Sequence, residues 1–160
     1  MSASFHPSSD PDTLALIQSI SLAVIREAAP EEERSVQKLT GPIVQAYEEG
    51  DLIAAATDSK TYGGFGTIDP VTLVVVPVVI EVLSELGKQL VPWGIDALKK
   101  RIEEKDASSK RQLVEMIDII VEQEFESVNR KVKSKKARSK EKTIKRAIKI
   151  QVKKHFKIEP

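Results

Sequence analysis

The sequence predicts an all-α fold: a small helical bundle around a central apolar helix that a proline kinks, followed by a long amphipathic helix and a basic C-terminal helix. Three observations support this prediction. The segment 69–90 is apolar over a greater length than any other part of the 160-residue chain. Apolar residues then recur every three or four positions over 114–132, and every fourth position over 144–156. Such spacing places them on one face of a helix.

The central helix is predicted to begin at Asp69-Pro70, because Asp is a capping residue and the φ angle of Pro is already helical. The β-branched residues over 71–82 favour a strand as the alternative, and Pro77 interrupts either structure. We favour a helix with a kink near Pro77, since helical spacing follows that residue. The residues with this spacing are Val79, Val82, Leu83, Leu86 and Leu90.

The chain before the central helix divides into an arm and several short helices. Residues 1–9 are small and polar and are expected to form a disordered arm. A helix should begin at Asp10-Pro11, and it is apolar on most faces, which predicts a central position. A second helix should begin at Pro30 and end near Leu39, because Thr40-Gly41-Pro42 interrupts the pattern. The remaining predicted elements are a third helix over 43–50, a helical turn over 51–56 and a glycine-containing loop over 57–67.

The chain after the central helix carries the two amphipathic helices. A turn at Asp106 to Ser109 precedes the long helix, which should end near Lys133. Its apolar stripe consists of Val114, Ile117, Val121, Phe125, Val128 and Val132. The predicted organisation is a disordered arm over 1–9, a helical core over 10–106, a long amphipathic helix over 107–133 and a basic amphipathic tail over 134–160.

The formal net charge of +1 conceals a strong division along the chain. Residues 130–160 hold fourteen Lys or Arg and two Glu, a net charge of +12, and the other 129 residues carry a net charge of −11. The sequence therefore describes an acidic body with a basic tail. Such asymmetry bears on partners and solubility rather than on the fold.

No catalytic, cofactor or metal site is predicted. The chain has no cysteine, which excludes disulfides, thiolate zinc sites and a cysteine nucleophile. His6 and His155 lack the partners that a catalytic triad or a metal site needs. The glycines over 63–66 lack the residues that complete a phosphate-binding loop. Glu81 and Glu85 share a helix face as an acid/base pair would, but the same spacing is typical of a solvated stripe.

The first residues, MSASFHPSSDPD, have neither the basic nor the apolar region of a secretory signal, so a cytoplasmic protein is expected. The uncharged run over 70–80 is shorter than the roughly 20 residues that span a bilayer. A buried core helix is therefore favoured for this run over insertion into a membrane.

The basic tail is the candidate functional site. Its cations would bind a polyanion by releasing counterions from phosphates. The predicted polyanion-binding residues are Arg130, Lys131, Lys133, Lys135, Lys136, Arg138, Lys145, Arg146, Lys149, Lys153 and Lys154. No base-reading motif accompanies them and aromatic residues are few, so nucleic-acid binding is expected to be sequence-tolerant.

The tail also carries an apolar stripe that needs a partner: another protein, the acidic body of the same or a second chain, or a membrane surface. The predicted contact residues are Ile144, Ile148, Val152 and Phe156, together with Trp93 as an interfacial ring. We expect a non-enzymatic accessory or adaptor protein that acts through its helices and grips a polyanion, nucleic acid above all, with its tail. The alternative is a membrane-active protein whose segment 70–95 inserts while the tail binds anionic lipid.

Overall fold

The computed structural model describes residues 11–49, 71–90, 100 and 102–158. Every regular element in these residues is a helix, which confirms the all-α class. The elements are α1 (Pro11–Ala28), the 3₁₀ helix η2 (Pro30–Glu32), α2 (Glu33–Glu48), α4 (Thr72–Leu90), α6 (Ala107–Val132), α7 (Lys135–Ser139) and α8 (Glu141–His155). The predicted arm over 1–9, the turn over 51–56 and the loop over 57–67 lie outside the described residues.

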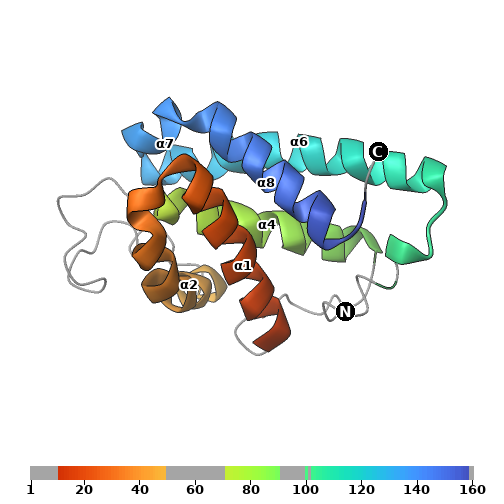
Figure 1. Ribbon diagram of the computed structural model, residues 1–160, viewed down its shortest axis with the longest axis horizontal. Helices are drawn as coiled ribbons and strands as arrows, with labels where there is room; N and C mark the ends of the chain where they lie inside the picture. The colour runs from red at the N-terminus through yellow and green to blue at the C-terminus, as the bar shows by residue number, and fades with distance from the viewer. Residues whose placement is uncertain (1–10, 50–70, 91–99, 101, 159–160) are drawn as a thin grey trace.

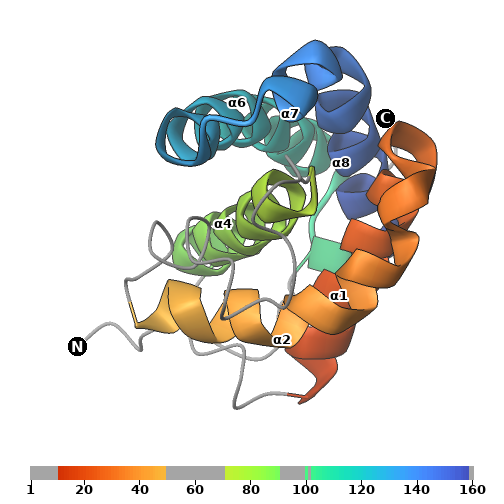
Figure 2. The same ribbon diagram turned by 90° about the vertical axis from the view of Figure 1, so that its left-hand side faces the viewer.

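Helix α4 is the central helix of the bundle, as its apolar sequence predicts. All side chains from Val71 to Ile80 are buried, because α1, α2 and α6 pack against the helix from different sides (Figure 2). Pro77 lies within the helix, which continues on both sides of it. The alternative of a strand over 71–82 is thus excluded. A helix that is apolar on all faces needs this surrounding layer to keep it from water.

The predicted break at Thr40-Gly41-Pro42 is wrong, because α2 continues through it to Glu48. A proline inside a helix costs about 3 kcal/mol, because a backbone hydrogen bond is lost and the ring clashes with the carbonyl of the preceding turn. That cost is outweighed by the burial of apolar side chains on both sides of Pro42, since each buried aliphatic side chain contributes about 2 kcal/mol. These side chains are Val36, Leu39, Ile43 and Val44.

The turn between α6 and α7 is held by side-chain hydrogen bonds. Lys133 adopts the left-handed conformation, with φ 58° and ψ 44°. The Ser134 N–H donates to the Asn129 Oδ1 at 2.9 Å, and the Asn129 Nδ2 donates to the Ser134 carbonyl at 3.3 Å. The Ser134 Oγ then accepts the Ala137 N–H at 3.0 Å and caps α7. The chain thereby reverses, and α8 runs back beside α6 (Figure 1).

Helix α8 is part of the core of the bundle. It packs against α1 on one side and α6 on the other (Figure 1). Its apolar face is buried, and the residues that form it are Ile144, Ala147, Ile148 and Val152, continued by Phe156 and Ile158 after the helix ends.

The N-terminus of α4 is capped by a residue that lies about forty positions earlier. Glu32 ends η2, and only 5% of its side chain is exposed. Its carboxylate accepts the N–H of Val71 at 3.0 Å, and the N–H and hydroxyl of Thr72 at 2.9 Å each. Lys136 of α7 donates to the same carboxylate at 2.8 Å. Glu32 therefore joins η2, α4 and α7, while the expected cap, Asp69, lies outside the described residues.

Replacing Glu32 with Gln should lower the free energy of unfolding by about 3 kcal/mol, because Lys136 loses its buried partner and the new amide faces N–H donors. Urea denaturation followed by circular dichroism measures the loss. The matched control is Glu33→Gln, whose carboxylate pairs with the exposed Arg26 and should cost less than about 1 kcal/mol. Equal losses in the two variants would contradict the role of Glu32.

Candidate polyanion-binding surface

Six of the eleven basic residues predicted to bind a polyanion are engaged in ion pairs with acidic residues of the same chain. They are Lys136, Arg138, Lys145, Arg146, Lys149 and Lys153. Their partners lie on α1, η2, α6 and at the start of α8. Much of the positive charge that the sequence gathers in the tail is thus neutralised by the body.

The side of α8 that faces α6 carries three of these lysines. Lys145 and Lys149 both donate to Glu122, at 2.7 and 2.9 Å, and Lys153 donates to Asp118 at 3.0 Å. Residues four apart share a helix face, so one side of α8 meets one side of α6. The hydrogen bonds from Lys145 and Lys149 hold the pKa of Glu122 below its usual value, which keeps the carboxylate charged.

Further ion pairs form around α7 and the start of α8. Arg138 donates to Glu126 and to Glu141, each at 2.6 Å, and the hydrogen bond from Arg138 lowers the pKa of Glu126. The cations of Arg138 and Lys145 lie 5.7 and 5.2 Å from the centre of the Phe125 ring. At these distances cations are attracted to an aromatic face. Arg138 and Lys145 therefore have partners that a phosphate group would have to displace.

The other five predicted residues, which are Arg130, Lys131, Lys133, Lys135 and Lys154, are exposed. None of them makes an ion pair with an acidic residue in the described part of the chain. The first four lie within six positions where α6 ends and α7 begins, and we call them the basic turn. Figure 2 faces the end of the molecule where α6 and α7 lie together. The C-terminal end of a helix favours cations, so this position is consistent with the dipole of α6.

The predicted apolar contact residues lie inside the protein. Ile144, Ile148, Val152 and Phe156 are at most 1% exposed, and they fill the space between α8 and its neighbours α1 and α6. Of the partners considered from the sequence, the body of the same chain is the one that covers this stripe. Trp93 lies outside the described residues.

A chain that ends at Lys133 should lose cooperative unfolding. It lacks five large buried apolar side chains, which are Ile144, Ile148, Val152, Phe156 and Ile158. Each contributes about 2 kcal/mol, against a typical total stability of about 5–15 kcal/mol. Thermal melting followed by circular dichroism tests this. The control chain ends at Ile158 and keeps the whole buried stripe. A sharp, unshifted transition in the shorter chain would contradict the assignment of α8 to the core.

A second polar cluster lies where α2, α4 and α6 meet. Tyr47 lies within hydrogen-bonding reach of Glu81 and Ser84, and burial, followed by the charge of Glu81, raises the pKa of the tyrosine well above its usual value. Burial also raises the pKa of Glu124, and the charges of Glu81 and Glu85 add to this effect. The charges of Lys131 and Lys88 act in the opposite direction on Glu124, and Lys88 pairs with Glu85 at 3.2 Å. Among the described residues, no group of three or more His, Cys, Asp or Glu side chains could hold a metal ion.

Replacing Glu124 with Gln should stabilise the protein at neutral pH by about 0.5 kcal/mol, because it removes a partly buried charge that Glu81 and Glu85 also repel. The raised pKa means that the folded state holds this proton more tightly than the unfolded state. The destabilisation by the charged Glu124 side chain is therefore fully present above the pKa that this side chain has in the folded state. It disappears as the pH falls below about 4.5, which is the ordinary pKa of a glutamate side chain. Melting temperatures from pH 3 to pH 8 should converge at the acidic end. An advantage for the variant that does not depend on pH would contradict this account.

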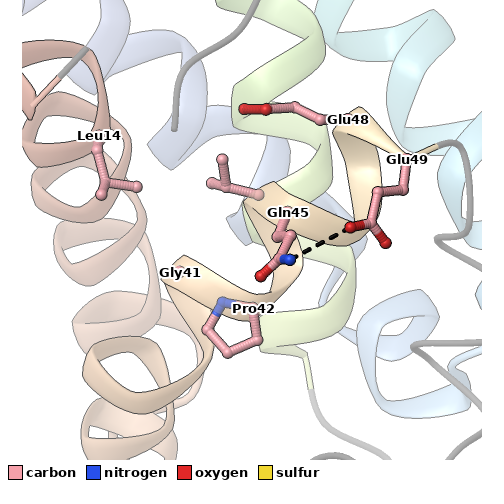
Figure 3. Close-up of a pocket in the computed structure, with 7 residues that line it drawn as sticks. Leu14, Gly41, Pro42, Gln45, Glu48 and Glu49 are labelled. Carbon is pink, nitrogen blue, oxygen red and sulfur yellow. Dashed lines mark hydrogen bonds between the residues drawn. The ribbon is translucent and has the colours of Figure 1, made fainter. Parts of the chain in front are cut away.

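An open surface pocket of about 630 Å³ lies along α2, on the side facing Leu14 of α1 (Figure 3). Its lining residues are Leu14, Gly41, Pro42, Val44, Gln45, Glu48 and Glu49. Gln45 donates from Nε2 to the Glu49 Oε1 at 3.2 Å across one side of it. Among the described residues, the lining includes the carboxylates of Glu48 and Glu49 but no Ser, Thr, Cys, His, Lys or Arg side chain.

The described helices include none with the length and apolarity to cross a membrane. No protein family, no curated protein and no solved structure matches the chain.

The residues that sequence reasoning missed are the acidic partners. The run Glu31 to Glu33 indicates a favourable helix start, but no local signal shows that Glu32 reaches α4 or that Glu31 reaches α7. These contacts become visible only in the folded structure, where elements that are distant in the sequence lie together.

Proposed function

We propose that this protein is a non-enzymatic interaction protein that binds a polyanion, with nucleic acid as the most suitable class, through the basic turn. The observation that carries the proposal is the contrast between two sets of cations. Six tail cations have carboxylate partners within the chain, whereas the four of the basic turn are exposed and make no ion pair in its described part. Cations without a counter-charge are those that can neutralise phosphates without first breaking a contact.

The chemistry of the basic turn supports binding that does not depend on base sequence. Three of its four members are lysines, which act as mobile point charges on phosphate rather than as planar forks that read a base edge. Phe125 and Phe156 are buried in the core, so neither ring is presented to stack on an unpaired base. Phosphate contacts position a nucleic acid but carry no sequence information.

The number of usable cations gives a quantitative test. The logarithm of the binding constant for duplex DNA falls against the logarithm of salt concentration with a slope of about −0.9 for each phosphate contact. Binding through the basic turn predicts a slope of about −4, whereas all eleven predicted residues would give about −10. Fluorescence anisotropy of a short labelled duplex over a salt series measures this slope for the full chain.

A variant with Arg130, Lys131, Lys133 and Lys135 all replaced by Gln should bind at least about tenfold more weakly at low salt. The matched control replaces four other cations with Gln: Lys100, Lys105, Lys110 and Arg111. It removes the same number of positive charges, but near the opposite end of α6. This control should keep the slope of the unmodified protein. Equal weakening in both variants would show that net charge, rather than the basic turn, governs binding.

Failure of the full chain to bind DNA or RNA at low salt would overturn the proposal. Co-flotation with vesicles of anionic lipid in that case would favour the membrane-active alternative, in which the same cations meet lipid phosphates.

A further inference from the structure

We infer that Glu31 is an internal competitor of the polyanion, and that Lys136 is a fifth binding residue that Glu31 holds back. This inference rests on the proposed function, because it concerns the regulation of the same surface. Lys136 follows Lys135 directly and is the next cation along from the basic turn. It differs from the members of that turn in having carboxylate partners within the chain.

The two carboxylates that pair with Lys136 have different surroundings. The Lys136 Nζ lies 2.6 Å from the Glu31 Oε1 and 2.8 Å from the Glu32 Oε2. The Glu31 side chain is 55% exposed, whereas that of Glu32 is 5% exposed. Lys136 itself is 29% exposed and lies between them. One of its partners thus faces solvent, while the other is enclosed by the protein.

The buried pair and the exposed pair therefore have different roles. Glu32 also accepts three hydrogen bonds from Val71 and Thr72, so a ligand cannot take its place without uncapping α4. Glu31 makes a solvent-exposed ion pair, which is weak because water and salt screen it. Removal of the Glu31 carboxylate therefore opens Lys136 to a phosphate oxygen while Glu32 stays in place.

Glu31 therefore limits the number of phosphates that the unmodified surface engages. A polymer held by the basic turn brings its next phosphate close to Lys136. There it meets the Glu31 carboxylate, which already occupies the ammonium group. The negative charge of Glu31 meanwhile repels any polyanion that approaches Lys136, which weakens binding.

The test compares Glu31→Gln with the unmodified protein and with Glu33→Gln by anisotropy of the same labelled duplex over a salt series. Glu33 pairs with Arg26, so its replacement removes the same charge two positions away without touching Lys136. Glu31→Gln should bind roughly two- to fivefold more tightly at low salt. Its salt slope should be steeper by about 0.9, because Lys136 adds one phosphate contact. Glu33→Gln should leave the slope unchanged.

The outcomes separate this inference from the function on which it rests. A slope for Glu31→Gln equal to that of Glu33→Gln would overturn the role of Glu31 while leaving binding at the basic turn intact. Absence of binding by the unmodified protein would overturn both. Glu31 is exposed and its ion pair with Lys136 is screened by water, so its replacement should change the melting curve only slightly. Melting of all three proteins verifies that they are compared in the folded state.

Discussion

The arrangement of the bundle depends on the buried carboxylate of Glu32 at the N-terminus of α4. An apolar helix in the centre of a bundle exposes no side of its first turn to water, so its free N–H groups need partners from the protein. Glu32 supplies them, and the negative charge also complements the helix dipole. The carboxylate in turn needs a cation, which Lys136 provides. Through this one side chain, the start of the central helix fixes the positions of η2 and α7.

The same requirement shapes the surface of the protein. Once Lys136 is committed to Glu32, α7 must lie against η2, and α8 then runs back along α6 with its lysines facing Glu122 and Asp118. The basic tail and the acidic body thus neutralise each other over much of their shared surface. Within the described residues, four cations that make no ion pair lie close together where the chain reverses, at the basic turn. The polyanion-binding proposal and the role of Glu31 both follow from this distribution.

The helical periods of the sequence predicted most of the fold correctly. Helices at Pro11, in the central segment and over 107–132 follow from capping residues and from apolar spacing, both of which are local signals. The break at Gly41-Pro42 was predicted wrongly, because local propensity was outweighed by a buried face on both sides of the proline. Of the candidate site, the sequence identified the cations but not which of them have carboxylate partners.

By itself, the sequence determined the all-α class, the central position of the apolar helix and the presence of an amphipathic basic segment, since each follows from side-chain spacing within one helix. Only the tertiary structure decided what covers the stripe of α8, which residue caps α4 and which cations stay without an acidic partner. These contacts join residues that are far apart in the chain, such as Glu32 and Lys136. The spacing of residues within a segment shows which face of a helix is apolar or charged, but it does not show which neighbouring helix packs against that face.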